Sequence, residues 1–142
     1  MATTEKTTIT VSATVNIPVE KVWKLWTRPE HITQWNSASD DWHTPQARND
    51  LRPKGKFKYR MEAKDGTFGF DFQGTFGNII TNELIEYTIS DGRKVQIKFE
   101  GKGYSTTITE TFEAEEINSL ELQQDGWQAI LNNFKRYAES IC

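Results

Sequence analysis

Apolar and polar residues alternate along the first part of the chain. The apolar positions of this stretch are Ile9, Val11, Ala13, Val15 and Ile17. A period of two predicts a strand with one buried face. After Pro18 the apolar residues take the spacing of one helical face, at Val19, Val22, Trp23 and Trp26. Pro29 predicts the end of this short helix and the start of a second one that carries Ile32 and Trp35.

The middle of the chain begins with a polar stretch, residues 36–54, that shows no sustained period. We interpret it as a long loop with one brief extended piece near Trp42. Beyond it the period of two returns, and turn sequences at residues 64–66 and 91–92 predict two hairpins. Together with the first strand, this pattern predicts roughly six or seven antiparallel strands.

The most regular helical stripe lies near the C-terminus. It runs from Leu120 through Trp127 and Phe134 to Ile141, behind a favourable N-cap at Asn118 or Ser119. A helix over residues 119–139 would span roughly 30 Å, enough to cross a small domain.

These elements predict one α+β domain over residues 1–142. A strongly curved antiparallel sheet wraps the long C-terminal helix, and two short helices follow the first strand. The apolar face of the sheet needs a cover, and only the last helix is long enough to provide it. Since a curved sheet and one helix do not close perfectly on each other, we expect an apolar cavity between them.

Composition narrows the possible partners. The chain has 20 acidic and 17 basic residues, so no large basic field is present and nucleic acid is not expected as a partner. The sequence shows neither a signal peptide nor a membrane span, and its single cysteine, Cys142, forms no internal bridge. We therefore expect a cytoplasmic protein. Five Trp and eight Phe must fill a core, line a cavity or face a partner.

Several short motifs resemble a known family. They are Pro18-Val19-Glu20-Lys21-Val22-Trp23, Trp26 with Pro29, Trp35, Lys64-Asp65-Gly66, Gly74, and Gly126-Trp127 with Leu131 and Phe134. Together they resemble the birch-pollen-allergen and START-related (SRPBCC) superfamily, and within it the domain of the activator of heat shock protein 90 ATPase. The resemblance spans nearly the whole chain and implies the helix-grip fold. For function it implies a range that includes hydrophobic ligand binding, chaperone contact and cyclase-like catalysis.

The titratable residues give few signs of chemistry. His31 and His43 are the only histidines, and no Cys-x-x-Cys or His-x-x-x-His spacing occurs, so neither a metal nor a cofactor is expected. His43 is either a hydrogen-bond donor to a ligand or a solvated loop residue. Arg60 either holds an acidic group of a ligand or forms a surface ion pair with Glu62.

Glu110 is the most informative acidic residue. It shares parity with Ile108 and Phe112, so its side chain is predicted to point into the curved sheet. There it would be a polar anchor or a general acid or base, unless the sheet opens to water at this point.

We conclude from the sequence that non-enzymatic binding of a small hydrophobic molecule is the favoured function, and we assign no catalytic residue. One alternative is a chaperone-interacting protein. Another is a polyketide cyclase-like enzyme, which is favoured if Glu110, His43 and Arg60 converge on one cavity. The predicted ligand-binding residues are Trp26, Trp35, Trp42, His43, Tyr59, Arg60, Tyr87, Phe99, Glu110, Gln123, Gly126 and Trp127.

Overall fold

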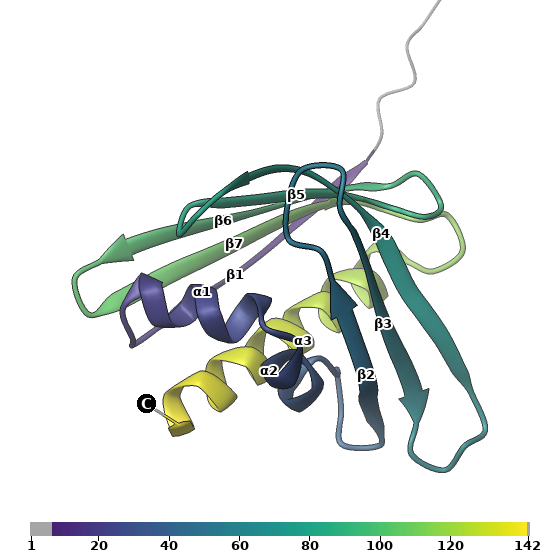
Figure 1. Cartoon of the computed structure of the whole chain (residues 1–142). Coiled ribbons are helices and arrows are strands. Elements are labelled where there is room, and N and C mark those ends of the chain that lie inside the picture. The colour runs from purple at the N-terminus through teal and green to yellow at the C-terminus, as the bar shows by residue number, and fades with distance from the viewer. Residues whose placement is uncertain (1–6, 142) are drawn as a thin grey trace, which may run out of the picture.

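The computed structural model describes residues 7–141, so Cys142 lies outside the described residues. Within them, one antiparallel sheet has the strand order β1-β7-β6-β5-β4-β3-β2 (Figure 1). The strands are β1 (Thr8–Val15), β2 (Trp42–Asn49), β3 (Lys56–Ala63), β4 (Gly69–Ile80), β5 (Leu84–Ile89), β6 (Lys94–Lys102) and β7 (Ser105–Glu113). The helices are α1 (Val19–Thr27), α2 (Pro29–Trp35) and α3 (Leu120–Ile141).

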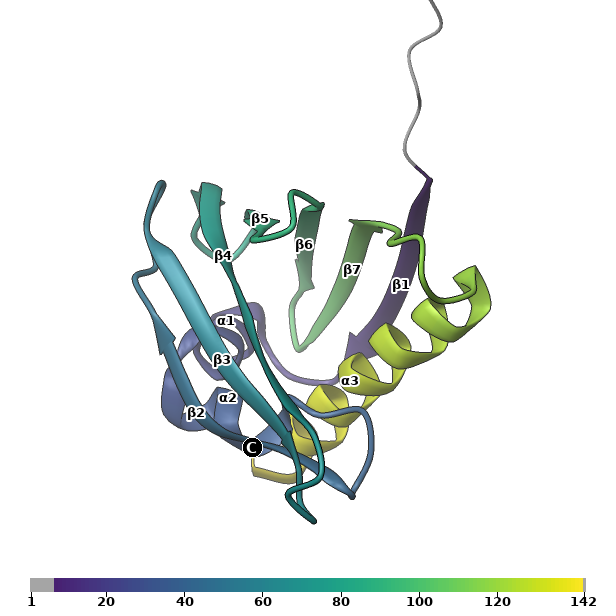
Figure 2. The ribbon, with the colours of Figure 1, turned by 90° about the vertical axis from the view of Figure 1, so that its right-hand side faces the viewer.

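The sheet curls into an open half-barrel, and α3 lies along its concave side (Figure 2). The two short helices α1 and α2 lie beside the C-terminal end of α3 (Figure 1). This arrangement confirms the predicted α+β helix-grip fold.

The first strand and the short helices follow the predicted pattern closely. In β1, Val11 and Val15 are buried, and the residues between them are more exposed. In α1, Trp23 and Trp26 are buried together on one face. Pro29 occupies the first turn of α2, where its missing N–H leaves no helical hydrogen bond unmade.

The predicted loop over residues 36–54 is wrong for residues 42–49. These residues form β2, which is the edge strand beside β3. An edge strand has one neighbour and buries little, so its sequence carries no clear alternation. Pro45 lies where the register between β2 and β3 shifts, a place that tolerates a residue without an N–H.

The last helix combines a defined start with a buried end. The hydroxyl of Ser119 accepts a hydrogen bond from the N–H of Leu122 at 3.1 Å, which makes Ser119 the N-cap. Further along, Leu131, Phe134 and Ala138 are completely buried. The C-terminal half of α3 is therefore part of the main core.

Candidate functional site

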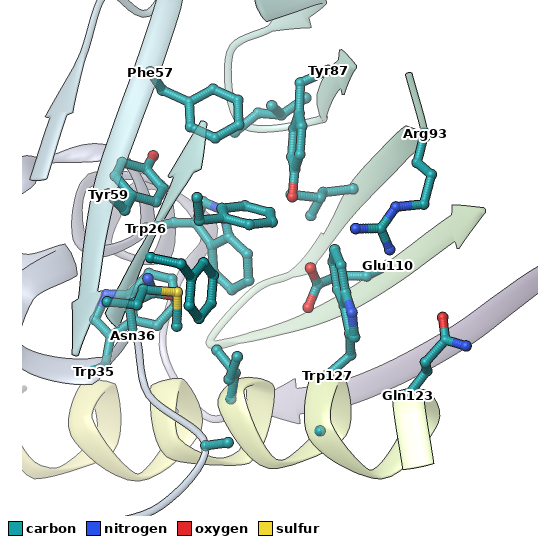
Figure 3. A pocket seen from close by; sticks show the side chains of 18 of the residues that line it. Trp26, Trp35, Asn36, Phe57, Tyr59, Tyr87, Arg93, Glu110, Gln123 and Trp127 are labelled. Carbon is teal, nitrogen blue, oxygen red and sulfur yellow. The ribbon is translucent and has the colours of Figure 1, made fainter. Parts of the chain in front are cut away.

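A cavity of about 450 Å³ lies between the concave face of the sheet and the N-terminal half of α3 (Figure 3). Strands β2 to β7, the short helices and α3 all contribute to its wall. Its α3 residues are Leu122, Gln123, Gly126, Trp127 and Ile130. The cavity is thus placed where the sequence predicted one.

Aromatic rings form much of the cavity wall. On the sheet side, Phe57 meets Tyr87 edge to face, with 4.8 Å between ring centroids. On the helix side, Trp127 stacks on Phe112 at 3.9 Å and meets Phe72 edge on at 6.2 Å. These contacts hold the rings in place by packing, so this part of the cavity wall is rigid and apolar.

Gly74 makes room for one of these rings. A Cβ at this position would lie 2.3 Å from the backbone oxygen of Thr88 and 3.0 Å from the ring of Phe57. The close approach of backbone and ring therefore requires glycine in the middle of β4.

Two tryptophans line the end of the cavity that borders the main core. Trp26 and Trp35 lie with their ring centroids 4.8 Å apart, and both pack edge on against Phe134. The indole N–H of Trp35 donates to the backbone oxygen of Leu25, so this polar atom is already satisfied. This end of the cavity is apolar.

Glu110 lies on the concave face, as its parity predicted, and is only 5% exposed. Its register neighbours are Val11 on β1 and Ile97 on β6, both of which are buried. Burial raises the pKa of the Glu110 carboxyl to about 8, and no hydrogen bond or ion pair opposes that rise. The carboxyl group is therefore mainly neutral at pH 7.

The Glu110 carboxyl faces the cavity. Within residues 7–141, every side-chain oxygen or nitrogen that is sealed from solvent has a hydrogen-bond partner. The Glu110 carboxyl has no such partner in that part of the chain, and Glu110 is a cavity-lining residue. Its hydrogen-bonding capacity is open to an occupant.

Two tyrosines add neutral polar groups to the cavity. Burial raises the pKa of Tyr59 to about 12, partly offset by a side-chain hydrogen bond with Asn49. Burial also raises the pKa of Tyr87, and the negative charge of Glu110 adds to the effect. Both phenols stay protonated at neutral pH.

Gln123 and Gly126 lie on the cavity side of α3. The Gln123 side-chain amide donates to the backbone oxygens of Glu115 and Asn118, and its Oε1 accepts the N–H of Glu115. These three hydrogen bonds fix the loop before α3 to the Gln123 side chain. A Cβ at Gly126 would meet nothing within 4 Å, so this glycine leaves open space beside the cavity and is not needed for close contact with the sheet.

Three of the predicted site residues lie outside the cavity. Phe99 is a core residue that packs edge on against Trp23 and Trp26. Arg60 has the opposite parity to the cavity-lining residues of β3, and His43 pairs in register with Glu62, which shares the parity of Arg60. Both side chains approach the Glu62 carboxylate instead, at 3.8 Å for His43 and 2.9 Å for Arg60. These two residues form part of a partly exposed charged cluster, and they do not converge with Glu110.

The other nine predicted residues line the cavity wall. They are Trp26, Trp35, Trp42, Tyr59, Tyr87, Glu110, Gln123, Gly126 and Trp127. Sequence reasoning missed Phe70, Phe72 and Arg93, which also line it. The alternation of β4 could have found the two phenylalanines, but its glycines obscured the inner face. Nothing in the sequence marked Arg93, which enters from the turn between β5 and β6.

Other kinds of site are less well supported. Among residues 7–141, no group of three His, Cys, Asp or Glu side chains is placed to hold a metal ion. In the same part of the chain, no helix is both long and apolar enough to cross a membrane.

Comparisons with known proteins agree with this geometry. Residues 16–139 match the family described as Activator of Hsp90 ATPase homolog 1-like protein. A comparison with curated proteins found no significant match.

Solved structures show how closely the fold is shared. The AHSA1-like protein from Aeromonas hydrophila, solved by NMR in solution, is 42% identical, with 94% of this chain and 93% of that one covered and a TM-score of 0.89. A protein from Cytophaga hutchinsonii is 55% identical, with coverages of 93% and 92% and a TM-score of 0.81. A crystal structure of a protein from Nitrosomonas europaea shares the fold at 18% identity, with 94% of each chain covered and a TM-score of 0.79.

Proposed function

This chain belongs to the family of Activator of Hsp90 ATPase homolog 1-like proteins, and we propose that it binds a small hydrophobic molecule in the cavity between the sheet and α3. The observation that carries the proposal is the cavity itself. Its volume of about 450 Å³ falls in the range of small-molecule sites, which is roughly 300–1,000 Å³.

The composition of the wall supports an apolar, aromatic occupant. Rings from β3, β4, β5 and α3 surround the space, and only a few polar groups reach it. Burying apolar surface against such rings contributes about 25 cal/mol per Å² of area removed from water. The few polar groups then set the orientation of the occupant.

Native mass spectrometry of protein purified without denaturation tests this proposal directly. A molecule that copurifies with the protein would reveal its chemical class by its mass. A titration with hydrophobic aromatic compounds provides a second test, because Trp26, Trp35 and Trp127 line the cavity and should report an occupant through their fluorescence. The absence of any saturable change would contradict the proposal.

A matched pair of variants locates the binding. Gly126→Leu places a side chain in the open space beside the cavity and should abolish binding while the protein stays folded. Gln124→Leu adds a similar apolar side chain to an exposed position of α3 that does not line the cavity, and should leave binding unchanged. Equal effects of the two substitutions would place the binding site elsewhere.

The family match favours one alternative function, which is contact with a chaperone. Stimulation of the ATPase of the Hsp90-type chaperone from the same organism by the purified protein would support it. The cyclase alternative loses its main argument, because the convergence of Glu110, His43 and Arg60 that would favour it does not occur. A cytoplasmic location remains part of the proposal and is testable by cell fractionation.

A further inference from the structure

The Glu110 carboxyl makes no hydrogen bond or ion pair within the described residues that would stabilise the fold. On its own strand it lies between Ile108 and Phe112, and across the sheet it is flanked by Val11 and Ile97. All four of these side chains are apolar and buried. A carboxyl group in such surroundings loses its hydration, and no protein donor within residues 7–141 compensates for that loss.

From this placement we propose that the occupant of the cavity carries a basic nitrogen, and that Glu110 is the counter-ion of its protonated form. This inference rests on the proposed function, because it specifies the chemistry of a molecule bound in the same cavity. It adds a charged anchor to what is otherwise an apolar site.

The other ionisable groups at the cavity leave this role to Glu110. Within the described residues they are Tyr59, Tyr87, Arg93 and Glu115. The two phenols are neutral, and the Glu115 carboxylate adds negative charge while it accepts the N–H of Asn118. The cavity therefore contains two acidic side chains and one basic one.

Arg93 does not neutralise Glu110. Its Nε donates to the Asp91 carboxylate at 2.9 Å, which offsets the guanidinium charge within the turn between β5 and β6. The positive charge of Arg93 lowers the pKa of Tyr87, whereas the pKa of Glu110 responds to burial alone. The Glu110 carboxyl is thus left available for a cation from outside the chain.

The surrounding rings favour the same class of molecule. Glu110, Tyr87 and Trp127 lie at one end of the cavity, where Arg93 also reaches the wall (Figure 3). The faces of tyrosine and tryptophan attract cations, and the attraction is stronger where water is excluded. An ammonium group beside Glu110 would therefore gain both an ion pair and ring contacts, while the rest of the molecule fills the apolar end near Trp26.

The protonation state of Glu110 gives this inference a measurable signature. The empty cavity holds a neutral carboxyl at pH 7, since burial raises its pKa to about 8. An ammonium ion requires the carboxylate, so its binding should release about 0.9 proton per site at pH 7. A neutral molecule would leave that proton in place.

Isothermal titration calorimetry with three probes tests the inference. The probes are 1-naphthylmethylamine, 1-naphthylmethanol and 1-naphthylacetate, which share one ring system and differ in the charge of the side group. We expect the amine to bind at least about tenfold more tightly than the alcohol. Titrations at pH 7 in two buffers of different ionisation enthalpy should show the proton release for the amine only.

Two variants test whether the preference for the amine depends on Glu110 itself or on the overall charge of the protein. Glu110→Gln keeps a neutral side chain of similar shape and should remove both the preference for the amine and the proton release, while binding of the alcohol persists. Glu62→Gln makes the same substitution outside the cavity and should alter neither result. Thermal melts of both variants confirm that they are folded.

Each of the other outcomes overturns a stated part of the argument. Equal affinities for amine and alcohol, a preference that survives in Glu110→Gln, or tightest binding of 1-naphthylacetate would overturn the role of Glu110 and leave the binding cavity intact. If none of the three probes binds the wild-type protein, the proposed function fails and the inference fails with it.

Discussion

The two halves of α3 serve different purposes. In the C-terminal half, Leu131, Phe134 and Ala138 are completely buried in the main core. In the N-terminal half, Gly126 and Trp127 are only partly buried and line the cavity. One continuous helix thus joins a packed region to an open one, and the position of a residue along it decides whether the residue packs in the main core or lines the cavity.

This contrast has a physical origin in the curvature of the sheet. Helix α1 and helix α2 fill the space between the sheet and the C-terminal half of α3 (Figure 1). No helix fills the corresponding space beside the N-terminal half within the described residues, so side chains alone must close it. Gly126 contributes no side chain there, and the cavity remains. Substitutions in the two halves should therefore have separable effects.

Phe134→Ala should have the largest effect on stability. The Phe134 ring is completely buried and packs edge on against Trp26 and Trp35, at centroid distances of 4.8 Å and 4.9 Å. Deleting a large buried aromatic side chain costs about 3–5 kcal/mol. Denaturant melts would measure the change, and a loss below about 1 kcal/mol would show that the C-terminal half is not the packed region described.

Trp127→Ala should cost less stability but more binding. Its indole stacks on Phe112 at 3.9 Å, yet it is only partly buried and borders a space that is already open. We expect a loss of about 2–3 kcal/mol in the same melts, below the full cost of a sealed aromatic site. A fluorescence titration followed through Trp26 and Trp35 should show that binding of an aromatic ligand is lost. Unchanged binding would break the division between the two halves.

The sequence predicted which face of a strand or helix a side chain occupies better than it predicted how deeply the side chain is buried. Alternation along β7 placed Glu110 on the concave face correctly, because parity follows directly from the pleat of a strand. Parity does not show how far a side chain lies from water, so burial and its effect on the pKa emerged only from the assembled sheet. For Gly126 the sequence does not show whether the missing side chain allows close packing or leaves open space, and the position of the helix relative to the sheet decides between the two.

Edges and turns were harder to predict for related reasons. The edge strand β2 buries little, so its residues showed no period and were interpreted as a loop. His43 was therefore assigned to the site, although β2 directs it toward Glu62 on the other face. Arg93 reaches the cavity from a turn, where neither the period of a strand nor that of a helix indicates direction.

The pH dependence of the free energy of unfolding tests whether Glu110 is buried in the cavity wall that faces the N-terminal half of α3. The pKa of Glu110 is about 8 in the folded chain, above its value of about 4.3 in an unfolded one. The folded state therefore binds more protons between these values, and the stability of the wild type falls as pH rises toward 8.

Glu110→Gln removes this titration and provides the reference. Between pH 6 and pH 7, the stability of the variant relative to wild type should increase by about 1.4 kcal/mol, the equivalent of one pKa unit. Urea melts at the two pH values measure this difference directly. A constant difference would mean that Glu110 is hydrated in solution.

Gly126→Ala should have the smallest effect on stability. The sign of the change tests whether the N-terminal half of α3 borders open space at this position. Glycine in a helix interior costs roughly 1 kcal/mol relative to alanine, because its backbone loses more freedom on folding. A Cβ at this position meets no atom within 4 Å, so no clash offsets the gain. We therefore expect the variant to be more stable by about 0.5–1 kcal/mol, with ligand affinity nearly unchanged because one methyl group occupies little of a cavity of about 450 Å³. Gly74→Ala is the matched control, since its Cβ would lie 2.3 Å from the backbone oxygen of Thr88 and the substitution should destabilise the sheet. If Gly126→Ala is destabilising in the same melts, then α3 approaches the sheet at Gly126 more closely in solution, and the open half of the helix is narrower than its geometry indicates.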